Sequence, residues 1–185
     1  MLIVHVSTYY YPSLGGLERA VQRLAEAQAK LGHEIHVITS AHRAGKRPKE
    51  EQVGNVHIHR IRAWTPHYPD LTIPQETPLE LLKSADIVQG WSQNSFFTYN
   101  IIRKAKKLGK PVAMYFLGVD YLRDHYNPLI RIFGYKYQTW ITRRVAKIVN
   151  LALTTNEFER RVLKEKYGIE AIVVPHGVDE VYLKT

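Results

Sequence analysis

Two adjacent glycines, Gly15 and Gly16, are the residues whose type and position most clearly suggest chemistry. From Leu17 to Leu31, apolar residues recur at steps of three and four with charged residues between them, a pattern that predicts an amphipathic helix. The first N–H groups of a helix have no partner within it, and the helix dipole is positive at that end. Residues without a Cβ would let a phosphate or a carboxylate approach these groups. The glycines therefore predict an anion site, or else only a tight turn in which Glu18 complements the dipole.

The segment around the glycines argues against a nicotinamide cofactor. An apolar, β-branched run, Leu2 to Val6, predicts a buried strand, and a long aromatic loop with Tyr10 and Tyr11 joins it to the helix. The dinucleotide fingerprint G-x-G-x-x-G is absent from this loop. The next predicted strand, Glu34 to Thr39, lacks the acidic residue that binds a ribose in such enzymes. A nicotinamide-dependent enzyme is therefore disfavoured.

Polar residues also follow later predicted strands at their carboxyl ends. Ser92 and Gln93 lie in the loop after the strand 86–89, and Asp120 follows the strand 112–116. Ligands of doubly wound sheets bind where parallel strands end in this way. For Asp120 the structural alternative is that its side chain caps the next segment.

The chain alternates between strand and helix patterns along its length. Strands are predicted at 2–6, 34–39, 56–61, 86–89, 112–116, 148–153 and 169–174, and helices at 17–31, 78–83, 95–108, 129–147 and 157–167. Seven strands alternating with helices predict an α/β fold with a Rossmann-like, doubly wound parallel sheet. No regular structure is expected in the charged loop 41–54, or in 63–78, which holds four prolines and either packs on its own domain or covers a substrate. Thr77 is expected to cap the helix 78–83.

The composition limits the class of protein. A chain of 185 residues with 45% apolar residues fits one domain. With no cysteine there is no disulfide or thiolate metal site, which suits a reducing cytoplasm. No export signal is expected, and no apolar run approaches the roughly 20 residues of a membrane helix. The formal net charge of +9 favours anionic partners, but no motif resembles those of nucleic-acid-binding proteins, so nucleic acid ranks last.

Four short motifs occur in a consistent order and spacing: Tyr10-Tyr11-Pro12 with Gly15-Gly16-Leu17-Glu18, Gly32-His33-Glu34, Gly109-Lys110-Pro111-Val112, and Val174-Pro175-His176-Gly177-Val178-Asp179. Together they resemble the N-terminal half of family 4 retaining glycosyltransferases with the GT-B fold. The resemblance implies two Rossmann-like domains, of which the N-terminal one mainly binds the acceptor. It implies that residues 1–175 form this domain and that 176–185, with His176, Gly177 and Asp179, form the junction toward a C-terminal donor-binding domain not present in this chain. The chain is then an isolated half, inactive alone, or a natural single domain.

The resemblance also implies a reaction. A sugar would move from a nucleotide diphosphate donor to an acceptor hydroxyl with retention, using the nucleotide sugar as co-substrate and neither a cofactor nor a metal. Gly15 and Gly16 would approach the donor phosphate. The family's His-Gly pair after the fifth strand is Leu117-Gly118 here, and because leucine cannot transfer a proton, Asp120 becomes the nearest catalytic candidate. The acceptor-side candidates are Tyr10, Tyr11, Ser92, Gln93 and Asp120. A rival from another class is a non-catalytic module that binds an anionic ligand at the Gly-Gly loop.

The predicted helix 129–147 suggests a membrane surface. At about 100° per residue one arc is apolar, formed by Phe133, Tyr137, Ile141 and Val145. Basic residues lie beside it, namely Lys136, Arg143 and Lys147, with Trp140 on the border. An indole between apolar and basic arcs suits lipid headgroups, so we expect a cytoplasmic protein that is peripheral at the inner face of an anionic membrane and acts on a sugar or lipid-linked acceptor. The alternative is that the apolar arc only packs on the sheet and the basic face is solvated.

Overall fold

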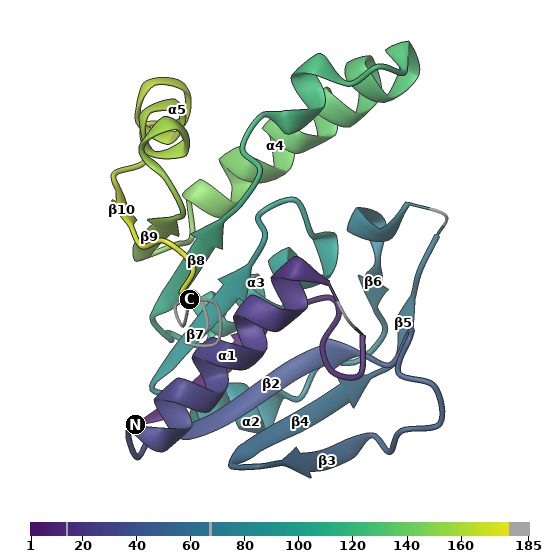
Figure 1. Cartoon of the computed structure of the whole chain (residues 1–185), viewed down its shortest axis with the longest axis vertical. Coiled ribbons are helices and arrows are strands. Elements are labelled where there is room, and N and C mark those ends of the chain that lie inside the picture. The colour runs from purple at the N-terminus through teal and green to yellow at the C-terminus, as the bar shows by residue number, and fades with distance from the viewer. Residues whose placement is uncertain (14, 67, 178–185) are drawn as a thin grey trace, which may run out of the picture.

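The computed structural model describes residues 1–13, 15–66 and 68–177, and its centre is an eight-stranded sheet (Figure 1). In chain order the strands are β1 Leu2–Val6, β2 Glu34–Ser40, β3 Glu50–Val53, β4 Val56–Ile61, β7 Ile87–Trp91, β8 Val112–Phe116, β9 Leu151–Thr154 and β10 Ala171–Val173. Their spatial order is β10-β9-β8-β7-β1-β2-β4-β3. Every neighbouring pair is parallel except β3 with β4. The seven predicted parallel strands are therefore confirmed.

The expectation that 41–54 has no regular structure was wrong, because β3 forms there and pairs antiparallel with β4. Gly54, with φ +59°, makes the turn between the two strands. The charged residues of β3 do not prevent this pairing, because a strand at the edge of a sheet needs only one partner strand and one covered side. Glu51 pairs with the guanidinium of Arg60, whose side chain is buried, and so fixes β3 to its neighbour.

The segment 63–78 also contains regular structure that the sequence did not predict. Two short strands, β5 Ala63–Trp64 and β6 Ile73–Pro74, pair antiparallel around a 3₁₀ turn, η1 Pro69–Leu71. The cap expected from Thr77 was wrong as well. Its hydroxyl donates to the carbonyl of Glu76 at 2.8 Å and accepts from Lys104 Nζ at 2.8 Å, and the next helix has no side-chain cap.

The helices of the described residues lie close to their predicted positions. They are α1 Gly16–Lys30, α2 Leu79–Ser84, α3 Phe96–Lys107, α4 Tyr135–Ala146 and α5 Glu157–Tyr167. Ser95 caps α3 and Asn156 caps α5, each accepting from the N–H group three residues on. The predicted helix 129–147 begins instead with a π-helical turn, η3 Ile130–Gly134, before α4.

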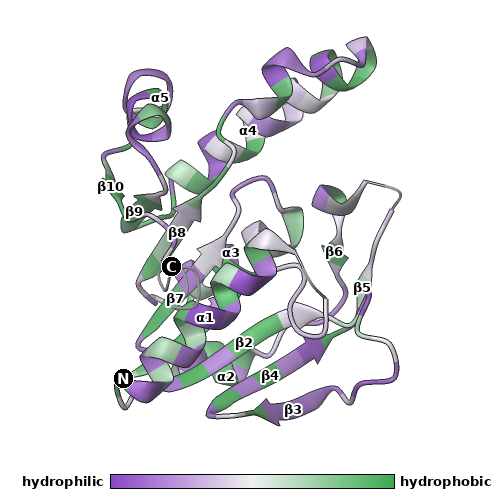
Figure 2. Ribbon diagram, in the orientation of Figure 1, coloured by the Kyte–Doolittle hydropathy of each residue, from purple (hydrophilic) through white to green (hydrophobic). Residues whose placement is uncertain are grey.

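Two apolar cores lie on opposite faces of the sheet, and hydrophobic and hydrophilic residues alternate along α1 and β4 (Figure 2). One core contains Val21 and Ala25 of α1 with strand residues such as Trp91 and Tyr115. The other contains buried residues of α2, α3, α4 and α5, namely Leu82, Phe97, Ile101, Ile141, Val145 and Leu163. Helices therefore cover both faces, as the doubly wound prediction requires. Because the strands run parallel, the loops after β1, β7, β8, β9 and β10 meet at one edge.

Candidate functional site

The N-terminus of α1 opens at the carboxyl edge of the sheet. Gly15 is the N-cap residue, with an extended backbone (φ −147°) and no side-chain cap. Gly16 is exposed, and a Cβ built on it would meet no protein atom within 4 Å. A Cβ on Gly15 would lie 2.1 Å from Oε2 of Glu18, so the Glu18 carboxylate lies against this residue. A Cβ on Gly15 would therefore have to displace the Glu18 carboxylate, whereas a Cβ on Gly16 meets open space.

Gly16 lines a groove of about 640 Å³ between α1 and residues 174–177. The basic side chains of Arg19, Arg23 and Lys30, together with Glu26, line its α1 wall. A stack of rings lines the other wall: Tyr115 lies parallel to Trp91 at 4.8 Å between ring centroids and near-parallel to His176 at 5.2 Å. Burial lowers the pKa of His176, and the nearby Glu159 opposes this shift. The groove can therefore offer an anion both cations and the uncapped helix end.

A buried histidine, His5, supports the aromatic wall. Trp91 Nε1 donates to His5 Nδ1 at 3.1 Å, and His5 Nε2 lies 2.7 Å from Gln28 Oε1. Since an indole N–H can only donate, Nδ1 accepts and Nε2 carries the proton. Burial lowers the pKa of His5 to about 4, although the hydrogen bond to Gln28 raises it. A neutral imidazole thus joins β1, β7 and α1, a role that a single histidine in an apolar strand did not reveal from the sequence.

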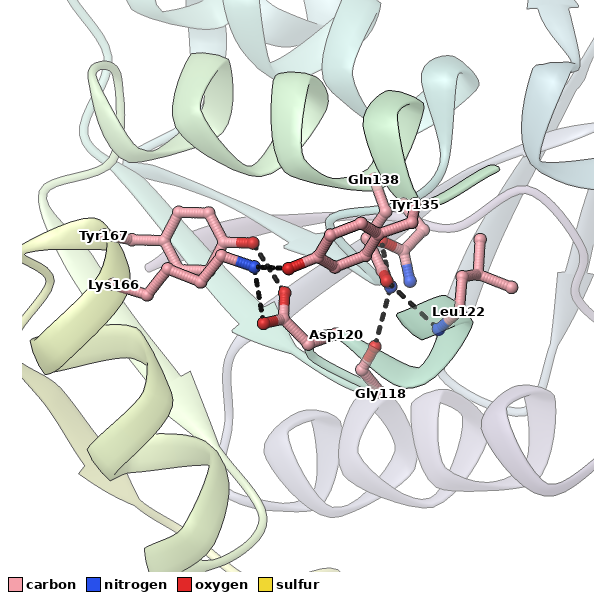
Figure 3. A network of polar contacts seen from close by, with 8 residues as sticks. Gly118, Asp120, Leu122, Tyr135, Gln138, Lys166 and Tyr167 are labelled. Carbon is pink, nitrogen blue, oxygen red and sulfur yellow. Dashed lines mark hydrogen bonds and ion pairs between the residues drawn. The ribbon is translucent and has the colours of Figure 1, made fainter. Parts of the chain in front are cut away.

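Asp120 lies in the loop after β8, in the left-handed conformation with φ +63°. Its Oδ2 accepts from Lys166 Nζ at 2.6 Å, its Oδ1 accepts from the Tyr167 hydroxyl at 2.6 Å, and Lys166 also contacts the Tyr135 hydroxyl (Figure 3). The alternative that its side chain caps the following turn was wrong, because the 3₁₀ helix η2, Tyr121–Asp124, has no side-chain cap. A catalytic role for Asp120 stays a prediction, and it requires this ion pair to open.

The other acceptor-side candidates have different surroundings. Ser92 is half-buried and left-handed, with φ +61°. Gln93 is fully buried and contacts the main chain of Leu117 through both ends of its amide. Tyr10 is buried, which raises the pKa of its phenol. The Tyr11 hydroxyl accepts from Arg47 Nη2 at 2.9 Å. Ser92 and Tyr11 therefore remain accessible for direct contact, while Gln93 and Tyr10 can act only by shaping the loops.

The remaining predicted site residues fall into two groups. His176 and Gly177 are exposed and line the groove, whereas Asp179 lies outside the described residues. The membrane-surface candidates come together on the outer side of α4, where Lys136, Trp140, Arg143 and Lys147 line a hollow of about 450 Å³. Of the apolar arc, Ile141 and Val145 are buried, but Phe133 is 66% exposed. No helix within the described ranges is both long and apolar enough to cross a bilayer.

A doubly wound, mostly parallel sheet with helices on both faces defines a Rossmann-like domain, and the groove along α1 begins at the carboxyl edge of this sheet. The chain belongs to Glycosyltransferase Family 4, whose family model matches residues 14–181. Comparison with curated protein sequences gave no match.

Solved structures share the fold at low sequence identity. They include sucrose-phosphate synthase from Thermosynechococcus elongatus, with a TM-score of 0.67 and 13% identity, and a glycosyltransferase from Rickettsia africae ESF-5, with a TM-score of 0.55 and 18% identity. The alignments cover 96% and 99% of this chain, but only 48% and 45% of those two chains. The chain therefore spans about half the length of both.

Proposed function

We propose that this chain is the acceptor-side domain of a retaining glycosyltransferase, which moves a sugar from a nucleotide diphosphate donor to an acceptor hydroxyl. Membership of the family supports a transferase of this type. The observation that carries the donor assignment is Gly16, exposed at a helix end without a side-chain cap and lining a groove in which Arg19 lies one turn further along α1. Main-chain N–H groups and cations in this arrangement suit the diphosphate of a nucleotide sugar.

On this proposal the donor and the acceptor bind mainly to different domains. Because the chain spans about half of the two similar structures, we propose that a C-terminal domain outside it supplies most of the donor affinity. Residues 1–175 then form the acceptor-side domain, and 176–185 lead to the partner domain. On this proposal the fragment alone is inactive, and transfer requires no metal.

The test is to incubate the full-length protein with a panel of nucleotide sugars and to measure nucleoside diphosphate release. We expect release that depends on one donor and on an acceptor, and none from residues 1–185 alone. Turnover by the fragment would refute the two-domain account. Binding of an anionic ligand without any release by the full-length protein would favour the rival, a non-catalytic module that uses the Gly-Gly loop.

For the acceptor we propose a lipid-linked sugar at the inner face of an anionic membrane, with a cytoplasmic, peripheral protein. The structure strengthens the case, because large apolar side chains are exposed where the chain projects ahead of α4 (Figure 1): Tyr126 is 90% exposed, and Leu129 and Phe133 are each 66% exposed. The basic residues Lys136 and Arg143 follow on the same projection. Apolar side chains next to cations match the acyl and headgroup layers of such a membrane.

Co-sedimentation with vesicles tests this surface. We expect the native chain to bind anionic vesicles more than neutral ones, and less at high salt, since each basic residue adds about 1 kcal/mol. Changing Lys136, Arg143 and Lys147 to glutamine should remove most of this binding, and Phe133→Ser should reduce it. The matched control changes three exposed lysines elsewhere, Lys46, Lys83 and Lys164, to glutamine and should keep binding. Equal loss in both triple variants would leave only a general effect of net charge.

A further inference from the structure

The loop that follows β8 is held by buried polar side chains from other segments. Gln93, in the loop after β7, accepts from the N–H of Leu117 at 2.8 Å and donates to its carbonyl at 3.0 Å. Gln138 of α4 is also fully buried, donates to the carbonyl of Gly118 at 2.9 Å and accepts from the N–H of Leu122 at 3.3 Å (Figure 3). Two glutamines thus hold the beginning and the end of the loop.

Glu159 of α5 holds the middle of the loop. Its side chain is buried, and Oε1 accepts from the N–H groups of Gly118 at 2.7 Å and Val119 at 3.3 Å. Oε2 accepts from the hydroxyls of Thr154 at 2.7 Å and Thr155 at 3.1 Å. A buried carboxylate is stable only when donors satisfy it in this way. Its negative charge therefore fixes the loop to β9 and α5.

The conformation that these contacts maintain is an unusual one. Gly118 has φ +62° and Asp120 has φ +63°, so two of three consecutive residues are left-handed. Few non-glycine residues adopt this region, although Asp and Asn do so more readily than others, and such residues cluster at functional sites. The loop is nevertheless open to solvent on one side, because Gly118 is exposed and Leu117 is half-buried against the core that contains Trp91 and Tyr115. Buried side chains therefore fix the inner side of the loop, and its outer side is accessible to solvent.

We propose that Glu159 is a positioning residue for the transfer reaction, which fixes the segment 117–120 in the conformation that receives the acceptor. The inference rests on the proposed function, since it assigns this loop to the acceptor. Leu117 then offers the acceptor an apolar contact, suited to the C–H face of a sugar ring or to an apolar aglycone. Glu159 touches neither substrate and acts through the main chain of Gly118 and Val119.

The experiment compares Glu159→Gln with Glu157→Gln in the full-length protein. Glutamine has nearly the shape of glutamate, but its amide nitrogen cannot accept from the main chain or from the threonines, and hydrogen bonds to charged groups are the stronger ones. Glu157 starts the same helix but is exposed and pairs with Arg160, so it serves as the matched control. We expect Glu159→Gln to raise the acceptor KM about tenfold and to leave the donor KM within twofold. Glu157→Gln should change neither.

Amide hydrogen exchange provides a second readout that does not depend on activity. We expect faster exchange at residues 118 and 119 in Glu159→Gln, with the central strands unchanged. Thr155→Val, which removes one donor to Glu159, should shift both readouts slightly in the same direction, and it replaces Glu159→Gln if that variant does not fold. The proposal would be overturned if Glu159→Gln raised the donor KM as much as the acceptor KM. It would also be overturned if amide exchange became faster while the acceptor KM stayed unchanged. If the native protein releases no nucleoside diphosphate, the proposed function fails, and unchanged exchange at 118 and 119 would overturn the loop assignment independently.

Discussion

The loops after β1 and β8 reach the same edge of the sheet, but they differ in whether side chains bind their main-chain N–H and carbonyl groups. In the first, Gly15 and Gly16 lead into a helix whose first N–H groups have no side-chain cap, and Gly16 is exposed beside a basic groove. In the second, side chains from three other segments bind the N–H and carbonyl groups of 117 and 118. Open N–H groups are available to a ligand, whereas satisfied ones give a fixed shape. The comparison suggests that the first loop binds charge and that the second presents a surface.

The largest effect should come from releasing the second loop with Gln93→Leu. This change leaves the partly buried N–H and carbonyl of Leu117 without their side-chain partners and removes the packing of a fully buried amide, which costs about 2 to 4 kcal/mol in the free energy of unfolding. Thermal denaturation should show a Tm lower by roughly 5 to 15 °C. At the first loop, the corresponding control Gly16→Ala should change Tm by less than about 2 °C, because a Cβ there meets nothing. Similar losses at both positions would end the distinction between the loops.

A second effect should appear in the pH dependence of stability, through His5 beneath the groove beside the first loop. Its folded-state pKa of about 4 lies below the ordinary value of 6.5, so the unfolded chain binds the proton more readily between these two values. The contribution of His5 to the free energy of unfolding is therefore fully present above about pH 6.5, and it decreases by about 3 kcal/mol as the pH drops to 4.

Chemical denaturation at pH 7, 5.5 and 4 measures this fall. His59 and His176 also have lowered pKa values and contribute in the same direction, so the native chain must be compared with His5→Gln. The variant should be less stable at pH 7, and its free energy of unfolding should fall less steeply as the pH drops. If the free energy of unfolding depended on pH in the same way in the two proteins, His5 would not remain neutral in the folded state.

How much of this could be predicted from the sequence depends on the distance over which a residue acts. The seven parallel strands were predictable because their apolar, β-branched runs record burial on both faces. β3 was missed because it is mostly polar, and β5 and β6 were missed because each is only two residues long, too short to show an alternating pattern. Gly15, Gly16, Ser92 and Asp120 were placed correctly at the carboxyl edge, because topology alone brings strand ends together.

The residues that were missed act through long-range contacts. Glu159 stands three residues after Asn156, a spacing typical of helix capping, and the Asn156 cap is indeed present. The sequence does not show that the carboxylate of Glu159 turns instead toward Gly118. Gln138, in a helix whose pattern predicted packing and a basic face, was missed for the same reason.

The first loop can be tested directly with Gly16→Val in the full-length enzyme. The added side chain would project into the groove and keep a phosphate away from the N–H groups of α1, so we expect the donor KM to rise about tenfold. Folding should change little, because a Cβ on Gly16 meets no protein atom within 4 Å and valine is no poorer than glycine as a helix residue. Steady-state kinetics with the preferred donor, together with thermal denaturation, separate the two effects. A variant that folds and keeps its donor KM would show that the glycines only form a turn.

The smallest effect is expected from Asp120→Asn, which removes the charge but keeps a side chain suited to the left-handed conformation. The partners Lys166 and Tyr167 would keep one acceptor oxygen, and both side chains of the ion pair are partly buried, so the loss of stability should be about 1 kcal/mol. That corresponds to a Tm lower by roughly 2 to 4 °C. If Asp120 serves only to hold the second loop, kcat should fall by less than about tenfold and the acceptor KM should rise, as in Glu159→Gln. If it exchanges a proton with the substrate, kcat should fall by about a hundredfold or more at unchanged acceptor KM. Because the ion pair with Lys166 already engages Oδ2, we expect the first result, and Lys166→Met should then reproduce it.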